Sequence, residues 1–94
     1  MKLRLAADIR GAPKTLELEG ETLTFGRGEK ADVQIEDLSL ARVHFRLSFE
    51  AGRWWVEDLE SPAGTWLDDA QLRSKQTFAP GMSLRAGGTT LKLT

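Results

Sequence analysis

Apolar and polar residues alternate in short runs along nearly the whole chain. The alternation is clearest in residues 2–5, 16–19, 43–49 and 91–93, where every second residue is Leu, Val or Phe. A period of two turns one side of each run toward a core, so the pattern predicts half-buried β-strands. No stretch of a dozen residues carries the apolar stripe that is typical of an amphipathic helix.

Glycine and proline interrupt these runs at intervals of roughly 8–12 residues, a spacing typical of β-sandwiches. The expected fold class is therefore all-β, with short strands in a sandwich or a barrel. A length of 94 residues suits one domain with one core, residues 1–94. Because the chain starts and stops on a strand, we expect either a stand-alone domain or a domain of a longer protein.

The charge balance argues against a dedicated nucleic-acid binder. Lys and Arg number 13 and Asp and Glu 14, for a net charge of -1, whereas a duplex binder usually carries a basic excess. A small β-barrel that binds single strands remains the alternative in this class. The absence of cysteine fits a reducing compartment. The N-terminus is not a signal peptide and no run is long enough to span a membrane, so a cytoplasmic protein is expected.

Catalytic chemistry finds little support in the sequence. The sequence has one histidine and no cysteine, and we find no nucleophile–base pairing and no metal-ligand cluster in it. Neighbouring acids such as Asp68 and Asp69 would point to opposite faces of a strand and form no catalytic dyad. We therefore expect no enzyme, no cofactor and no metal.

Three segments are longer than a tight hairpin requires and are candidates for function. They are residues 26–32, 36–44 and 58–65. Their motifs occur in a fixed order: Gly26-Arg27, Asp32-Val33-Gln34-Ile35, Ala41-Arg42-Val43-His44, the aromatic run from Trp54 to Leu59, and Ser61-Pro62-Ala63-Gly64-Thr65. In order and spacing this series resembles the forkhead-associated (FHA) domain, and with the flanking strands the resemblance covers essentially the whole chain.

The resemblance implies a sandwich of about eleven strands that recognises phosphothreonine peptides through loops at one end. A phosphate carries about −1.5 to −2 charges and three acceptor oxygens, so its site needs a guanidinium and further donors. The family's Gly-Arg arginine supplies the charge, the serine of its Ser-Arg-x-His motif donates to the phosphate, and the asparagine of its Asn-Gly-Thr motif holds the peptide backbone. The residues that match the pattern are Gly26, Arg27, Arg42, His44, Ser61, Gly64 and Thr65.

Three positions depart from the family pattern. Ala41 stands where the family has the serine, Ala63 where it has the asparagine, and Pro62 where it often has a hydroxyl residue. Ser39 is a possible replacement donor. Losing two hydrogen bonds to a charged group removes roughly 3–6 kcal/mol, or two to four decades of affinity. We therefore predict an interaction module whose phosphothreonine recognition is weakened or lost; the alternative is functional phosphothreonine binding anchored by Arg27 and Arg42.

Other roles remain open for several of these residues. Arg27 is either a phosphate anchor or a loop residue paired with Glu29, Asp32 or Glu36, and Ser61 either donates to a ligand or caps its turn. The resemblance implies that His44 ties two loops together, and by alternation it points away from Val43 and Phe45. The remaining structural expectations concern Asp58 as a loop acceptor, Gly64 as a special backbone position and Thr65 as a partner of loop backbone.

Two further surfaces are candidates for contact with another protein. Trp55 and Trp66 are interface anchors if they are exposed, because aromatic residues dominate interaction hot spots. Residues 91–93 could pair edge to edge with another copy, which would give weak self-association or a scaffold role in a signalling or secretion assembly.

Overall fold

The computed structural model describes residues 1–94, in which eleven strands and no helix are present. The strands are β1 (Lys2–Ile9), β2 (Ala12–Glu19), β3 (Thr22–Gly26), β4 (Val33–Gln34), β5 (Phe45–Glu50), β6 (Arg53–Asp58), β7 (Trp66–Leu67), β8 (Ala70–Gln71), β9 (Gln76–Thr77), β10 (Leu84–Ala86) and β11 (Thr89–Leu93). The all-β fold predicted from the alternating pattern is confirmed. No helix is present that could cross a lipid bilayer.

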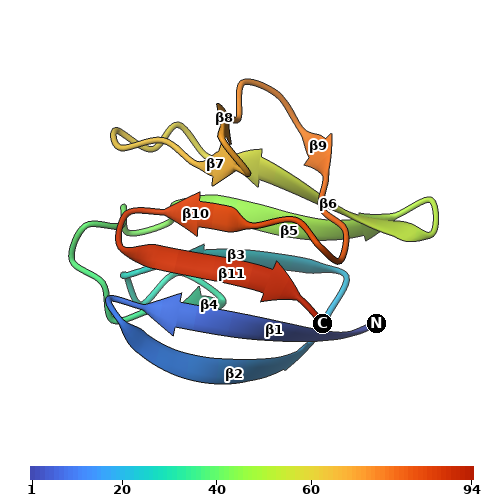
Figure 1. Ribbon diagram of the computed structural model, residues 1–94, viewed down its shortest axis with the longest axis horizontal. Coiled ribbons are helices and arrows are strands. Elements are labelled where there is room, and N and C mark those ends of the chain that lie inside the picture. The colour runs from blue at the N-terminus through green and yellow to red at the C-terminus, as the bar shows by residue number, and fades with distance from the viewer.

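The strands form two sheets that pack face to face. One sheet has the order β2-β1-β11-β10-β7-β8 and the other β4-β3-β5-β6-β9 (Figure 1). The first and last strands pair antiparallel, with Leu5 opposite Leu93 and Ile9 opposite Thr89. Both termini therefore lie together at one end of the sandwich.

The core lies between the sheets and follows the alternation of the sequence. In β1 the buried residues are Leu3, Leu5 and Ala7, while the residues between them are exposed. Phe25 of β3 and Phe45 of β5 stack with ring centroids 4.8 Å apart. Burying a side chain of this kind contributes about 1.5–3 kcal/mol, so such positions dominate the stability of the sandwich.

Two expectations from the sequence are wrong in detail. The run predicted as a strand over residues 43–49 forms a strand only from Phe45, since both Val43 and His44 belong to the preceding loop. Residues 91–93 do not form an edge: β11 pairs with β1 on one side and β10 on the other. Pairing between the two ends of the chain, which no local pattern reveals, places β11 inside its sheet. The edges are β2 and β8 in one sheet and β4 and β9 in the other.

Candidate recognition surface

The three candidate loops lie together at one end of the sandwich. Strands β3 and β6 end there and β5 begins there, which brings the β3–β4, β4–β5 and β6–β7 connections to the same end (Figure 1, left). The turns after β1 and β10 join them, because both strands pair antiparallel with β11. The surface is thus built from segments that are distant in sequence.

His44 connects two of the loops. Its ring is fully buried; Nδ1 accepts a hydrogen bond from the backbone N–H of Ala41 at 2.9 Å, and Nε2 lies 2.8 Å from the carbonyl oxygen of Gly64. A carbonyl can only accept, so the proton of the imidazole resides on Nε2. His44 therefore points inward at the junction of the β4–β5 and β6–β7 loops.

Asp58, the last residue of β6, organises the β6–β7 loop that follows it. Its carboxylate accepts hydrogen bonds from the Ser61 N–H at 3.0 Å, the Ser61 hydroxyl at 2.5 Å and the Thr65 hydroxyl at 2.6 Å. The Ser61 hydroxyl thus caps its own turn. The expectation that Thr65 serves loop backbone is wrong: its buried hydroxyl donates to a carboxylate, which is a stronger acceptor. Gly64 has φ of 79°, a conformation that favours glycine.

Asp37 holds the β4–β5 loop against the β10–β11 turn, a role not anticipated from the sequence. Its fully buried carboxylate accepts hydrogen bonds from the Ser39 N–H and hydroxyl, the Gly88 N–H and the Thr89 hydroxyl, and Arg10 Nη1 lies 3.6 Å away. Burial by itself would raise the pKa of Asp37, but the hydrogen bonds from Ser39, Thr89 and Gly88 outweigh it and keep the pKa below its ordinary value. The signal was an aspartate followed two residues later by serine, which is typical of an Asx turn.

The Ser39 hydroxyl takes part in this network as both donor and acceptor. It donates to Asp37 and lies 3.1 Å from the backbone N–H of Gly88, for which it is the acceptor. The hydroxyl therefore faces the β10–β11 turn and serves to fix the loop.

The β3–β4 and β4–β5 loops touch at two glycines. A Cβ atom on Gly26 would lie 2.1 Å from the backbone oxygen of Arg42, and one on Gly28 would lie 2.9 Å from the Arg42 Cβ. The N–H groups of Arg27 and Gly28 donate to the carbonyls of Ala41 and Arg42 across the same contact. The absence of side chains at these glycines is what lets the two loops approach so closely.

This contact places basic side chains around one hollow. The hollow has a volume of about 420 Å³, and its lining includes Arg27, Lys30 and Arg42 together with Glu29. Nε of Arg27 donates to the carbonyl of Leu40 at 2.8 Å, which directs the side chain along the β4–β5 loop. None of the ion pairs in the structure involves these three cations, and Asp32 bonds to Thr24 instead of Arg27.

The positions that depart from the family pattern carry no side-chain donor. Ala41 is half-buried beside the His44 ring, and Pro62 and Ala63 are exposed on the β6–β7 loop. This end of the sandwich also exposes the apolar side chain of Leu38, a residue that is 87% accessible to solvent. Trp55 and Trp66 are half-buried, with Lys75 and Arg85 over their rings at 6.0 and 5.2 Å, so neither is a freely exposed anchor.

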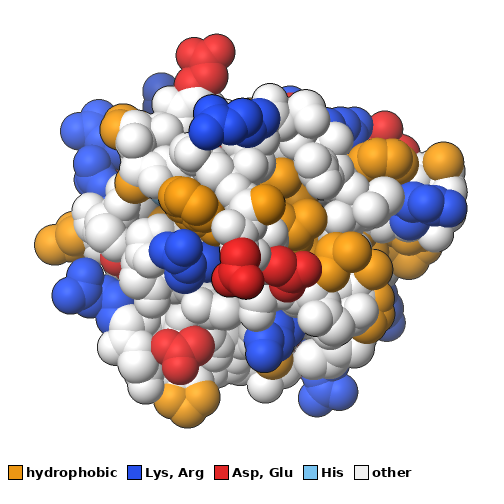
Figure 2. All heavy atoms as spheres, turned by 45° about the horizontal axis from the view of Figure 1, so that its top comes forward, with side chains coloured by type: hydrophobic (Ala, Val, Ile, Leu, Met, Phe, Trp, Pro, Cys, Tyr) orange, Lys and Arg blue, Asp and Glu red, His pale blue; other side chains and the backbone are white.

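Figure 2 shows Lys and Arg side chains at the left-hand end of the molecule, the end that carries the loops, and also elsewhere on this face. An all-β sandwich with eleven strands, a Gly-Arg loop beside an Arg-x-His loop and a histidine tying two loops together defines the FHA class of domain. Within that class, the chain belongs to the family described as the inner membrane component of T3SS, cytoplasmic domain, which matches residues 10–94.

Individual relatives agree with this assignment. The FHA domain-containing protein FhaB of Mycobacterium tuberculosis is 31% identical over 78 residues, which cover 83% of this chain and 50% of FhaB. The chain thus spans about half the length of the curated relatives it matches. The FHA domain of CT664 from Chlamydia trachomatis has the same fold, with a TM-score of 0.88 at 20% identity over 100% of this chain and 97% of that one.

A third relative has the same fold. It is an FHA domain from a structural and functional analysis of phosphothreonine-dependent interactions. Its TM-score is 0.84 at 24% identity, and the match covers 99% of this chain and 95% of that chain. At this identity the likeness establishes the fold that the two chains share.

Proposed function

We propose that this chain is a protein–protein interaction module of the FHA type, in which residues 1–94 act as one domain. Its partner binds to the loops at residues 26–32, 36–44 and 58–65. The family description and the fold shared with a phosphothreonine-dependent domain support this class of function and a cytoplasmic location. Binding modules need no catalytic group, which is consistent with a sequence that offers no nucleophile–base pair.

The main support for this proposal is the hollow between the loops, because none of the three cations that line it has an ion-pair partner. Arg27 and Arg42 attract a phosphate as charges, and the exposed Leu38 offers an apolar contact to a protein partner. Ala41, Pro62 and Ala63 supply no side-chain donor to the phosphate or to the peptide backbone. Phosphothreonine recognition is therefore weakened, and Arg27 and Arg42 provide what remains of it.

Mapping by NMR tests where such a ligand binds. A degenerate phosphothreonine peptide library, added at millimolar concentration, is expected to shift the amide signals of the three loops and of Gly87 and Gly88. The outer faces of both sheets should remain unchanged. Shifts confined to a sheet face or to β8 and β9 would contradict the proposed binding surface.

A further inference from the structure

The edge strand β2 leaves one side without a partner. Its eight residues pair with β1 alone, and in Figure 1 β2 forms the lower border of its sheet. Exposed strand edges are templates for pairing with another chain, and proteins usually blunt them with proline, lysine or short strands. Pro13 and Lys14 protect the start of the β2 edge in this way. Residues 15–19 contain neither proline nor lysine, and only the charges of Glu17 and Glu19 protect that part of the edge.

The register shows which backbone groups of β2 are free. The Gly20 N–H donates to the carbonyl of Met1 at 2.9 Å, and bonded pairs then alternate along the ladder. Leu16 and Leu18 thus face β1 with their N–H and C=O groups, whereas Thr15, Glu17 and Glu19 direct theirs outward. Pro13 belongs to the outward set, which explains why the missing N–H of a proline is tolerated there.

The inner face of this edge is only partly covered. Across the sandwich the matching edge is β4, which has two residues, so Leu16 and Leu18 remain half-buried. A hollow of about 400 Å³ opens between the two sheets there, and Ile9, Pro13, Leu16 and Ile35 are among the residues that line it. An added strand could therefore place apolar side chains beside the two leucines.

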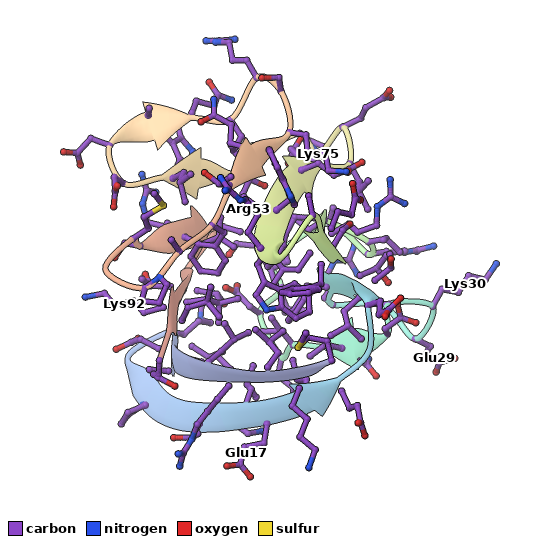
Figure 3. The ribbon with its side chains drawn as sticks, turned by 90° about the vertical axis from the view of Figure 1, so that its right-hand side faces the viewer. Glu17, Glu29, Lys30, Arg53, Lys75 and Lys92 are labelled. Carbon is purple, nitrogen blue, oxygen red and sulfur yellow. The ribbon has the colours of Figure 1, made fainter.

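Strand β1, the natural partner of β2, shows which side chains pair well with β2. Leu3 and Leu5 stand opposite Leu18 and Leu16 on the inner face, and Lys2 and Arg4 stand opposite Glu19 and Glu17 on the outer face. Arg4 Nε lies 3.4 Å from Glu17 Oε1. Figure 3 shows Glu17 pointing away from the body of the molecule, so its carboxylate is also within reach of a strand added on the free side.

We propose that the free edge of β2 binds an extended segment of a partner protein in which Lys or Arg alternates with apolar residues. Backbone bonds to Thr15, Glu17 and Glu19 would supply affinity, and the alternation would supply specificity. The outward backbone groups of Thr15, Glu17 and Glu19 lie along β2, so this proposal does not depend on the function proposed for the loops.

A second copy of the chain fits the same edge poorly. When two β2 strands pair antiparallel with Leu16 opposite Leu18, Glu17 lies directly opposite the Glu17 of the other copy. When Leu16 lies opposite Leu16, the same two carboxylates are diagonal neighbours on the outer face. Like charges at such positions are destabilising, so the edge discriminates against itself and in favour of a basic strand.

Hydrogen exchange with a defined peptide tests the proposal. The probe is a short peptide containing Lys-Leu-Arg-Leu, the sequence of residues 2–5, flanked by Gly and Ser; its control has Glu in place of both basic residues. The basic peptide is expected to protect the amides of Thr15, Glu17 and Glu19, while the acidic peptide leaves them unprotected. Thr15→Pro should abolish binding, because it removes an outward N–H without breaking a bond to β1.

Charge variants keep the test informative if Thr15→Pro fails to fold. Glu17→Lys should weaken binding roughly tenfold, whereas Glu21→Lys, the same charge change just beyond the strand, should leave it unchanged. Equal binding of both peptides, equal loss in both charge variants, or no protection at millimolar peptide would overturn the proposal. Concentration-dependent protection of these amides without peptide would show that a second copy is the occupant, which would also overturn it.

Discussion

A variant that carries both Ala41→Ser and Ala63→Asn is expected to bind phosphothreonine peptides roughly a hundredfold more tightly than the natural chain. A hydrogen bond to the charged phosphate contributes about 1.5–3 kcal/mol and one to the neutral peptide backbone about 0.5–1.5 kcal/mol, so their sum corresponds to roughly one and a half to three decades of affinity. The lower part of this range is expected because such contributions are not additive. Fluorescence anisotropy of a labelled phosphothreonine peptide measures the change.

The scaffold around both positions is already in place. The backbone N–H of Ala41 donates to His44, and the carbonyl of Gly64, next to Ala63, lies 2.8 Å from the same ring. New side chains at these positions would therefore extend from an ordered backbone. Ala51→Ser, in the β5–β6 turn at the opposite end, is the matched control and should change nothing. No gain in the double variant would show that the loops are arranged for a different ligand.

Gly26→Ala should separate the two arginine-bearing loops and destabilise the domain by about 3 kcal/mol. The added Cβ would stand 2.1 Å from the backbone oxygen of Arg42, and backbone cannot move aside as a flexible side chain can. The hydrogen bond from the Arg27 N–H to Ala41 would be strained by the same displacement. Thermal or urea denaturation measures the loss of stability. Weaker phosphopeptide binding by protein that is still folded reports the separation of the β3–β4 and β4–β5 loops.

Gly52→Ala provides the control for this substitution. Gly52 has φ of 78° in the β5–β6 turn, and nothing lies within 4 Å of the position of a Cβ atom. At Gly52 the strain of a left-handed conformation alone costs about 1 kcal/mol. Gly26 has no positive φ, so a larger loss of stability in Gly26→Ala than in Gly52→Ala reports the contact with Arg42. A Gly26→Ala variant that is as stable as Gly52→Ala would mean that the two loops do not make this close contact.

The sequence was sufficient to predict the fold class and the three long loops that meet at one end of the sandwich. Alternation predicted the strands because a sandwich buries one face of each strand, as Leu3, Leu5 and Ala7 show in β1. The motif residues Gly26, Arg27, Arg42, His44 and Gly64 were found because the FHA family spaces them in a fixed order. The structure places these residues on adjacent loops, as the family pattern implies. Their roles in binding remain predictions.

Other features depend on contacts between distant segments and could not be read locally. The place of β11 inside its sheet results from pairing with β1 at the other end of the chain. Asp37 bonds to Gly88 and Thr89, which lie 51 and 52 positions further along the chain. Only the Asx turn between Asp37 and Ser39 had a local sequence signal. Likewise, the alternation in β2 predicted a strand but gave no indication that one side would remain unpaired.

Phosphate binding in the hollow between the loops can be measured by a titration of phosphothreonine peptides and their unphosphorylated copies against the natural chain and Arg27→Ala. We expect weak binding that favours the phosphorylated peptides, and a preference that largely disappears in Arg27→Ala. Tight binding that survives the loss of Arg27 would contradict the assignment of the phosphate to the hollow between the loops. Equal binding of both peptide forms by the natural chain would contradict phosphate recognition of any strength.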